Sequence, residues 1–407
     1  MISKKLVLVC LFNFLVAALM GLTMRFAFVS SFEFNYRNLT HAHSHVAMLG
    51  WVYLMLYVFI VHHFIPKKQK VFNRLFWITE VAVIGMMISF PLQGYALFSI
   101  SFSTLHIFCS YYFAYLVFKH QNIASKPTRV LLKTAVIFML ISTLGVWCLG
   151  PAVGLLGQAS AFYQIAIQFF LHFQFNGWFL IGLLGLFFHF FKIKDNTIFK
   201  PFYITLVLST VGTLALPISW FAPFPILNWI NGFAIICQIT CFILFIKMSN
   251  TGIQKHLKAV PKEAKYLYYF ALISFAIKIG FQSASLFPYI GLIAKQNHNF
   301  VIGFIHLTML GVVTGFLFAY IIQSKTSYKT SVFNYGVYSF IIGFLGSEFI
   351  LFFQGLRFVF GIGLIPNYYL LLFILSCFLV IGISFIFMSI LCSKTNYYDN
   401  QKTTKAP

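Results

Sequence analysis

Histidine side chains stand at the start of an apolar run, where their type and spacing suit the binding of a metal ion or a metal-containing cofactor. The stretch HAHSHVAMLGW places His41, His43 and His45 directly before residues that favour a membrane helix. Neutral imidazole is a common ligand of transition metals, and ionisable side chains inside a membrane are rare unless they have a function. This stretch is therefore a candidate site.

Two later stretches repeat the pattern. His172 opens HFQFNGW and His306 opens HLTMLGV, so that His45, His172 and His306 are each followed by a glycine five residues later. The three histidines are about 130 residues apart, which is the length of four membrane helices with their loops. Every fourth helix is therefore predicted to carry one of them.

The composition is that of an integral membrane protein. Of 407 residues, 60% are hydrophobic, 20% are aromatic and only 8% are charged. The formal net charge of +22 does not indicate nucleic-acid binding, because the basic residues fall in the loops between apolar runs. The seven cysteines are scattered and form no CxxC pair, so they are interpreted as packing residues.

Twelve apolar runs are long enough to span a bilayer as helices. They cover residues 6–24, 40–64, 75–92, 97–118, 131–150, 162–190, 200–218, 226–248, 266–286, 298–323, 332–354 and 367–392. We expect one polytopic membrane domain over residues 1–407, with residues 393–407 as a short cytoplasmic tail. When the basic residues are assigned to the loops between the predicted helices, 23 of the 28 Lys and Arg residues fall on one side of the membrane. This side is expected to be the cytoplasmic one, which predicts a cytoplasmic-membrane protein with both termini in the cytoplasm.

This topology sets the depth of the repeated histidines. Even-numbered helices enter from the outside, so His45, His172 and His306 are predicted to lie about 8–15 Å below the outer surface. Three imidazoles at one depth meet only if helices 2, 6 and 10 lie together. The expected architecture is all-α, with a pseudo-three-fold array of four-helix units.

Twelve helices, internal termini and histidines on helices 2, 6 and 10 resemble the catalytic subunit (subunit I) of the haem–copper oxidases, including the nitric oxide reductases. His45 and His306 match the two ligands of that family's six-coordinate haem, and HLTMLG resembles its helix-10 motif. His172 matches the helix-6 copper ligand, and Arg357, in the expected loop after helix 11, resembles the arginines that pair with haem propionates. The resemblance implies a b-type haem and a copper site.

Two departures distinguish this chain from that family. Phe304 occupies the position of the histidine that binds the oxygen-reducing haem, and the seventh run, LVLSTVGTLALPISW, contains no histidine for copper. The resemblance is therefore to a divergent member with an incomplete dinuclear site. His41, His43 and His298 stay open as copper ligands or as partners of propionates.

Three charges are expected inside the membrane, at Glu80, Lys278 and Glu348. Each costs at least ~2.5 kcal/mol by insertion scales unless it is paired or hydrated. Lys278 and Glu348 neutralise one another in one interpretation, and the carboxylates serve a proton path in another.

The function predicted from these features is electron transfer, or redox or nitric oxide sensing, by a bis-histidine haem in the respiratory membrane. A quinol or cytochrome donor and partner respiratory subunits are implied, with the lipid bilayer as surroundings. One alternative is an active but divergent terminal oxidase or nitric oxide reductase. A secondary transporter and a haem-free scaffold are the others.

Overall fold

The computed structural model describes residues 2–30, 33–66, 69–324, 326, 328 and 330–393. Over these residues the chain is helical, without a strand, and twelve helices are long and apolar enough to cross a membrane. These spans are α1 (Lys4–Phe26); α2 (Tyr36–His45) with η1 (Val46–Tyr53) and α3 (Leu54–Phe64); α4 (Gln69–Gln93); α5 (Leu97–His120); α6 (Lys126–Leu156); α7 (Ala161–His172) with η2 (Phe173–Phe179) and α8 (Leu180–Phe190); α9 (Phe199–Gly212) with α10 (Ala215–Ser219); α11 (Pro225–His256); α12 (Lys262–Ala284); α14 (His298–His306) with η4 (Leu307–Thr314) and α15 (Gly315–Gln323); α16 (Thr330–Val359); and α17 (Tyr368–Leu391). Short helices η3 (Leu257–Ala259) and α13 (Pro288–Gln296) lie in two connections.

The twelve expected runs correspond to these twelve spans, but most helices extend beyond the apolar run. The fifth, expected over residues 131–150, occupies Lys126–Leu156, because a helix satisfies its own backbone and continues into the polar interface. The seventh is divided between α9 and α10. Pro217 lies in α10 and has no N–H to donate to the preceding turn, which accounts for the division. Residues 394–407 of the expected tail lie outside the described part.

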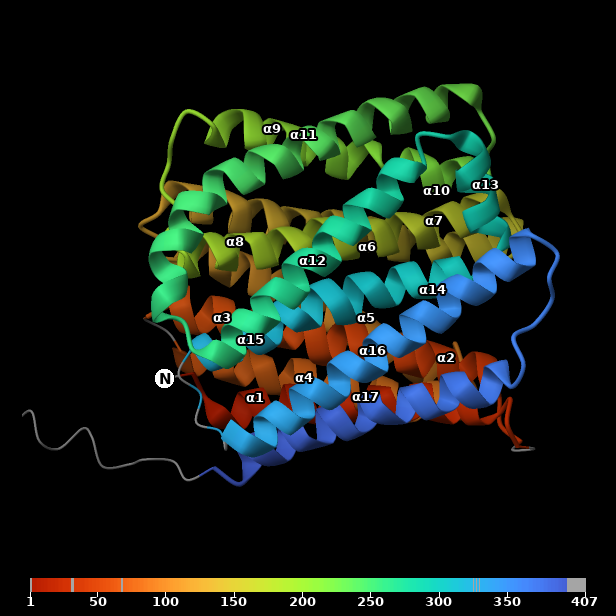
Figure 1. Ribbon diagram of the computed structural model, residues 1–407, viewed down its shortest axis with the longest axis horizontal. Helices are drawn as coiled ribbons and strands as arrows, with labels where there is room; N and C mark the ends of the chain where they lie inside the picture. Colours follow the sequence, from red (N-terminus) through yellow and green to blue (C-terminus); the bar gives the residue numbers. More distant parts are fainter. Residues whose placement is uncertain are drawn as a thin grey trace, which may run out of the picture.

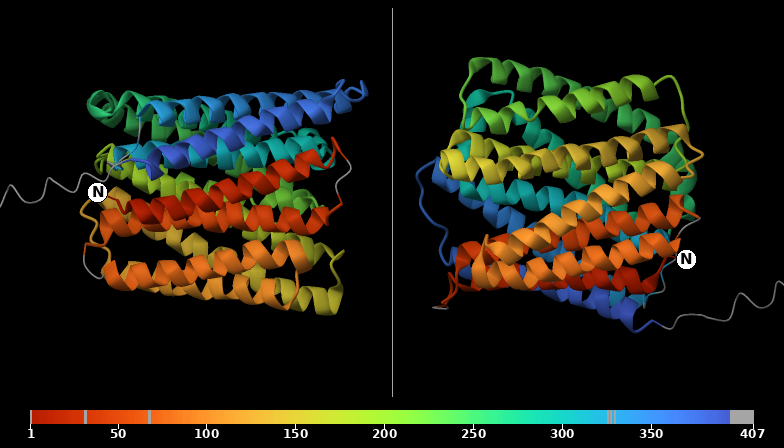
Figure 2. Two further views of the ribbon diagram at one scale, coloured as in Figure 1. Left: turned by 90° about the horizontal axis from the view of Figure 1, so that it is seen from below. Right: turned by 180° about the vertical axis from the view of Figure 1, so that it is seen from behind.

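The twelve spans form one bundle, with α9 and α11 along one edge and α16 and α17 along the opposite edge (Figure 1). The first and last spans lie side by side, and Lys4 Nζ donates to the Leu391 carbonyl over 3.2 Å. Figure 2 shows α1 (red) and α17 (deep blue) adjacent in two further views. The two described ends of the chain are thus at the same end of the bundle, as an even number of crossings requires.

Large apolar side chains cover the outside of the bundle. Trp229 is 78% exposed and Leu155 is 83% exposed, and many Phe and Ile residues on other helices are also exposed. An exposed apolar surface of this extent is expected only against lipid. The chain is therefore a multi-pass membrane protein.

The second, sixth and tenth spans lie at the centre. Most of their apolar residues are buried, and their α3, α8 and α15 parts meet directly. The ring of Tyr320 stacks on Phe190 with centroids 4.8 Å apart, lies edge-on to Phe59 at 5.8 Å, and its hydroxyl donates to the Leu183 carbonyl over 2.9 Å. We call this end, which also contains Lys4 and Leu391, the terminal half, and the end around α2, α7 and α14 the histidine half.

The histidine-to-glycine repeat has a structural meaning. Directly after His45, His172 and His306, each central span changes from α- to π-helical geometry, in η1, η2 and η4. The glycine five residues on lies within this wider segment, where a neighbouring helix packs closely. A Cβ atom would lie 2.8 Å from Val83 at Gly50, 2.5 Å from Phe138 at Gly177 and 2.8 Å from Ser274 at Gly311. These glycines therefore serve helix packing, and π-helical segments often accompany functional sites.

Candidate functional site

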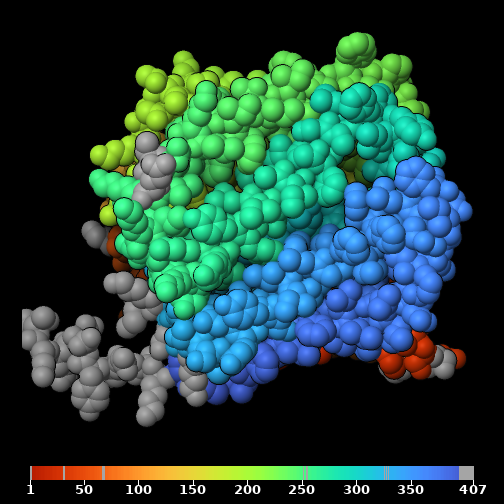
Figure 3. Space-filling model, in the orientation of Figure 1, coloured from red at the N-terminus to blue at the C-terminus, as the bar shows by residue number. Residues whose placement is uncertain are grey.

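Packing differs sharply between the two ends of the three central spans. In the terminal half, nine of the eleven residues of α3, nine of the eleven of α8 and eight of the nine of α15 are buried. In the histidine half, one residue of ten in α2, two of twelve in α7 and none of nine in α14 are buried. Figure 3 shows a hollow between α12 (green) and α16 (blue), over α14. The centre of the histidine half is thus loosely filled by protein.

His43 and His306 both lie in this half of the bundle, within range of one another's charge. The His43 ring donates from Nδ1 to the Ala17 carbonyl of α1 over 2.8 Å, and it lies against Gly21, where a Cβ atom would be 3.0 Å from its Cε1. His306 is close enough to His43 and to Arg25 for their charges to act on its ring. The three side chains come from α2, α14 and α1.

Glu348 of α16 completes this group. Its Oε1 atom lies 3.7 Å from His306 Nδ1, too far for a hydrogen bond, and it has no hydrogen-bond partner among the described residues. A Cβ atom at Gly303 would lie 3.3 Å from Glu348 Oε2, so the small residue one turn before His306 leaves room for the carboxylate. Glu348 is also close enough to Arg25 for their charges to interact. We call His43, His306, Glu348 and Arg25 the histidine pair site.

His45 points in another direction. Its ring lies 4.4 Å from Phe90 and 6.1 Å from Tyr95, and its Nδ1 donates to the His41 carbonyl over 2.8 Å. His41 faces the same two aromatic rings, at 6.3 and 4.7 Å. His41 and His45 therefore share one face of α2, and His43 lies on another.

His172 lies near the polar side chains of α9 and α12. It is 8% exposed, and its Nε2 donates to the Thr210 carbonyl over 2.7 Å. Asn176, one turn later, donates to the His172 carbonyl over 3.3 Å and accepts from Lys278 Nζ over 2.9 Å. Lys278 is therefore a neighbour of His172, whereas Glu348 belongs to the histidine pair site. Mutual neutralisation of Lys278 and Glu348 was the wrong interpretation.

The remaining candidates lie toward the surface. Arg357 is in the last turn of α16, not in a loop, and its guanidinium donates to the carbonyls of Ile362, Gly363 and Leu364, so its donors stabilise the following segment. His298 is exposed at the first position of α14. Neither is placed at the histidine pair site by these contacts.

A copper site is not supported by the ligands present. Within the described residues, no three His, Cys, Asp or Glu side chains are grouped so that they could hold a metal ion. His172 keeps only Nδ1 free, and a lysine is its neighbour.

Sequence reasoning missed the roles of Arg25 and Asn176. Arg25 was one of four basic residues on the predicted outer side, and only its position at the end of α1 beside Glu348 distinguishes it from the others. Asn176 lies four residues after His172, and this helical spacing was an available signal.

Comparison with protein-family models found no match, and comparison with curated proteins found none.

Proposed function

We propose that this chain binds a b-type haem between His43 and His306 in the histidine half of the bundle, as an electron-transfer or redox-sensing component of the respiratory membrane. The proposal is supported by two imidazoles, on α2 and α14, that lie within range of one another's charge in the half of the bundle where the central spans are less buried. This assignment takes His43 as the partner of His306 in place of the predicted His45, whose ring faces Phe90.

The surroundings of the two imidazoles would suit them to hold a haem iron. His43 donates Nδ1–H to the Ala17 carbonyl, which fixes its tautomer and leaves Nε2 as a lone-pair donor. The Nδ1 atom of His306 lies 3.7 Å from Glu348 Oε1, so Nε2 is the nitrogen that would be offered to iron. Histidine ligands usually donate their second N–H to a carbonyl or carboxylate in this way, and that bond orients the ring.

Charge and polarity also fit. A haem is a largely apolar disc with two propionates, and when bound it supplies reversible one-electron chemistry at its iron. Arg25 is the cation close to His306, so it is the proposed partner of a propionate in place of Arg357. Glu348 Oε1 has no hydrogen-bond partner within the described part of the chain, so it is free to take up a proton when the charge of the site changes. It is also free to accept a hydrogen bond from the His306 N–H. The predicted orientation, with both termini in the cytoplasm, puts this site in the outer half of the membrane.

A visible spectrum of the protein purified in detergent tests the proposal. Dithionite reduction is expected to produce the sharp bands of a low-spin, six-coordinate haem, with about one haem per chain by pyridine haemochrome assay. A colourless protein that stays colourless after incubation with haem contradicts it. That result would leave the transporter and the haem-free scaffold as the surviving functions.

We expect no proficient reduction of oxygen or nitric oxide by this chain alone. Phe304 cannot ligate a second iron, and the described residues provide no group of three ligands for a second metal. Oxygen and nitric oxide uptake by the purified, pre-reduced protein is the measurement. Rapid turnover that disappears in His172→Ala would show an active dinuclear centre and establish the divergent oxidase instead.

A further inference from the structure

Lys278 is a fully buried amine in the interior of a membrane protein. Its side chain is 0% exposed, and it lies in α12 between α11, η2 and α14. An ammonium group in this position is costly unless its three N–H donors are satisfied. How they are satisfied determines what the lysine does.

Oxygen atoms and one aromatic face surround the Lys278 amine. Its Nζ donates to Asn176 Oδ1 over 2.9 Å and to Gln282 Oε1 over 2.6 Å, and it lies 5.4 Å from the centroid of the Phe304 ring. A cation within about 6 Å of a ring face is attracted by the ring. The three directions of an ammonium group are therefore all occupied by groups that favour a positive charge.

Further hydrogen bonds fix the orientation of the two amides. Asn176 donates its Nδ2–H to the His172 carbonyl, and Gln282 Oε1 also accepts from Gln238 Nε2 over 2.9 Å. Neither amide can turn its nitrogen toward Lys278 without losing these bonds. The surroundings are thus arranged for a cation, and we call Lys278, Asn176, Gln282 and Phe304 the ammonium site.

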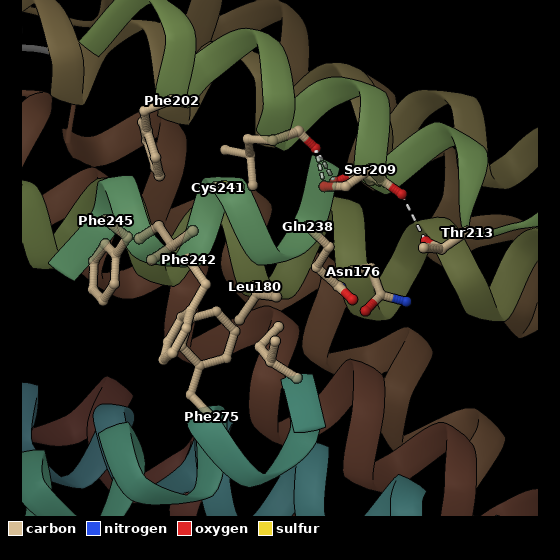
Figure 4. A pocket seen from close by; sticks show the side chains of 14 residues that line it. Asn176, Leu180, Phe202, Ser209, Thr213, Gln238, Cys241, Phe242, Phe245 and Phe275 are labelled. Carbon is tan, nitrogen blue, oxygen red and sulfur yellow. Dashed lines mark hydrogen bonds between the residues drawn. The ribbon is translucent and has the colours of Figure 1, made fainter. Parts of the chain in front are cut away.

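A small, mostly apolar cavity with a few polar groups lies beside Asn176 of this site. Asn176, Gln238, Ser209, Thr210 and Thr213 contribute to its lining, and its volume is about 30 Å³, room for roughly two water molecules. Figure 4 shows the amides of Asn176 and Gln238 close together at the cavity, and Gln238 Oε1 is buried there without a protein partner.

No carboxylate neutralises this charge. Among the described residues Asp195 pairs with Lys126, Glu348 lies beside His306, and Glu80 accepts from Asn13 over 2.9 Å. Lys278 acts on the ring of His172, which it adjoins through Asn176. It also touches Phe304, two residues before His306 in α14. An ammonium ion at Lys278 would therefore lie between the two histidine-bearing helices.

We propose that Lys278 is a resident ammonium ion that serves as the fixed positive charge beside His172, where the sequence predicted copper, and stabilises an electron at the histidine pair site. This inference rests on the proposed haem. A metal cation at His172 is repelled by the ammonium ion. An electron at the histidine pair site adds negative charge to the same half of the bundle. The ammonium ion attracts this negative charge, because charges interact strongly at low dielectric.

The presence of the ammonium ion is tested without haem by a double-mutant cycle on thermal stability. Gln282→Glu keeps the shape and both accepted hydrogen bonds while it adds a negative charge. We expect it to raise the melting temperature by about 2 °C or more when Lys278 is present, and to lower it in the Lys278→Met background. An equal effect in both backgrounds would show that no ammonium ion is there, and would overturn the inference whether or not haem is bound.

The effect on the electron is tested by redox titration of the haem. Lys278→Met removes a positive charge, so we expect the equilibrium constant for reduction of the haem to fall about tenfold. This corresponds to a midpoint potential that is lower by about 59 mV. Lys295→Met is the matched control, because Lys295 is exposed and carries the same charge. Equal shifts in the two variants would contradict the stabilising role. Absence of haem from the wild type would reject the proposed function, while the stability cycle still decides whether Lys278 is charged.

Discussion

Replacing His306 with alanine is expected to abolish the low-spin haem spectrum, and His43→Ala is expected to do the same. Each change removes one of the two proposed axial nitrogens, and a haem held by a single imidazole becomes five-coordinate and loses the sharp reduced bands. Haem content per chain and the reduced-minus-oxidised spectrum are the measurements, made on protein that elutes as the wild type does in gel filtration.

His45→Ala separates the two possible partners of His306. Its ring lies against Phe90 and bonds to its own helix, so this variant is expected to keep the spectrum. His298→Ala, at an exposed position, controls for general loss of a histidine. Loss of the bands in His45→Ala with retention in His43→Ala would restore the ligand set that the sequence resemblance implied.

The second large effect is expected for Trp51, which links three of the helices that position the site. Its ring is 1% exposed and stacks on Phe14 of α1 with centroids 4.8 Å apart, and its Nε1 donates to Thr314 Oγ1 of η4 over 3.0 Å. Trp51→Ala leaves a cavity at this junction and removes the bond to Thr314. We expect the free energy of unfolding to fall by about 3–5 kcal/mol.

Unfolding in detergent, followed by temperature or denaturant, measures this loss. Trp229→Ala is the matched control, since Trp229 is 78% exposed and faces away from the core. A loss no larger for Trp51 than for Trp229 would mean that the central spans are not held together at this point. Haem content of Trp51→Ala would then report how far the site depends on the junction.

The spacing of the candidate histidines along the central spans could be predicted because it depends on position along the sequence. His45, His172 and His306 each precede a π-helical segment with a glycine packed against a neighbouring helix, so the repeat seen in the sequence corresponds to a repeated structural unit. The direction of each ring could not be predicted in the same way. His43 and His45 are two residues apart and so point to different sides of α2.

The sequence by itself determined the class and the number of spans. Inside a bilayer every backbone group needs an internal partner, so apolar runs of sufficient length have to be helices, and their count follows from composition alone. Only the tertiary structure decided which side chains meet. The packing of α2 and α14 in the bundle brings His43 within range of the charge on His306, and the approach of α12 to η2 brings Lys278 to Asn176. These residues are more than a hundred positions apart in the sequence. Their proximity depends on how whole helices pack, which a local sequence pattern does not predict.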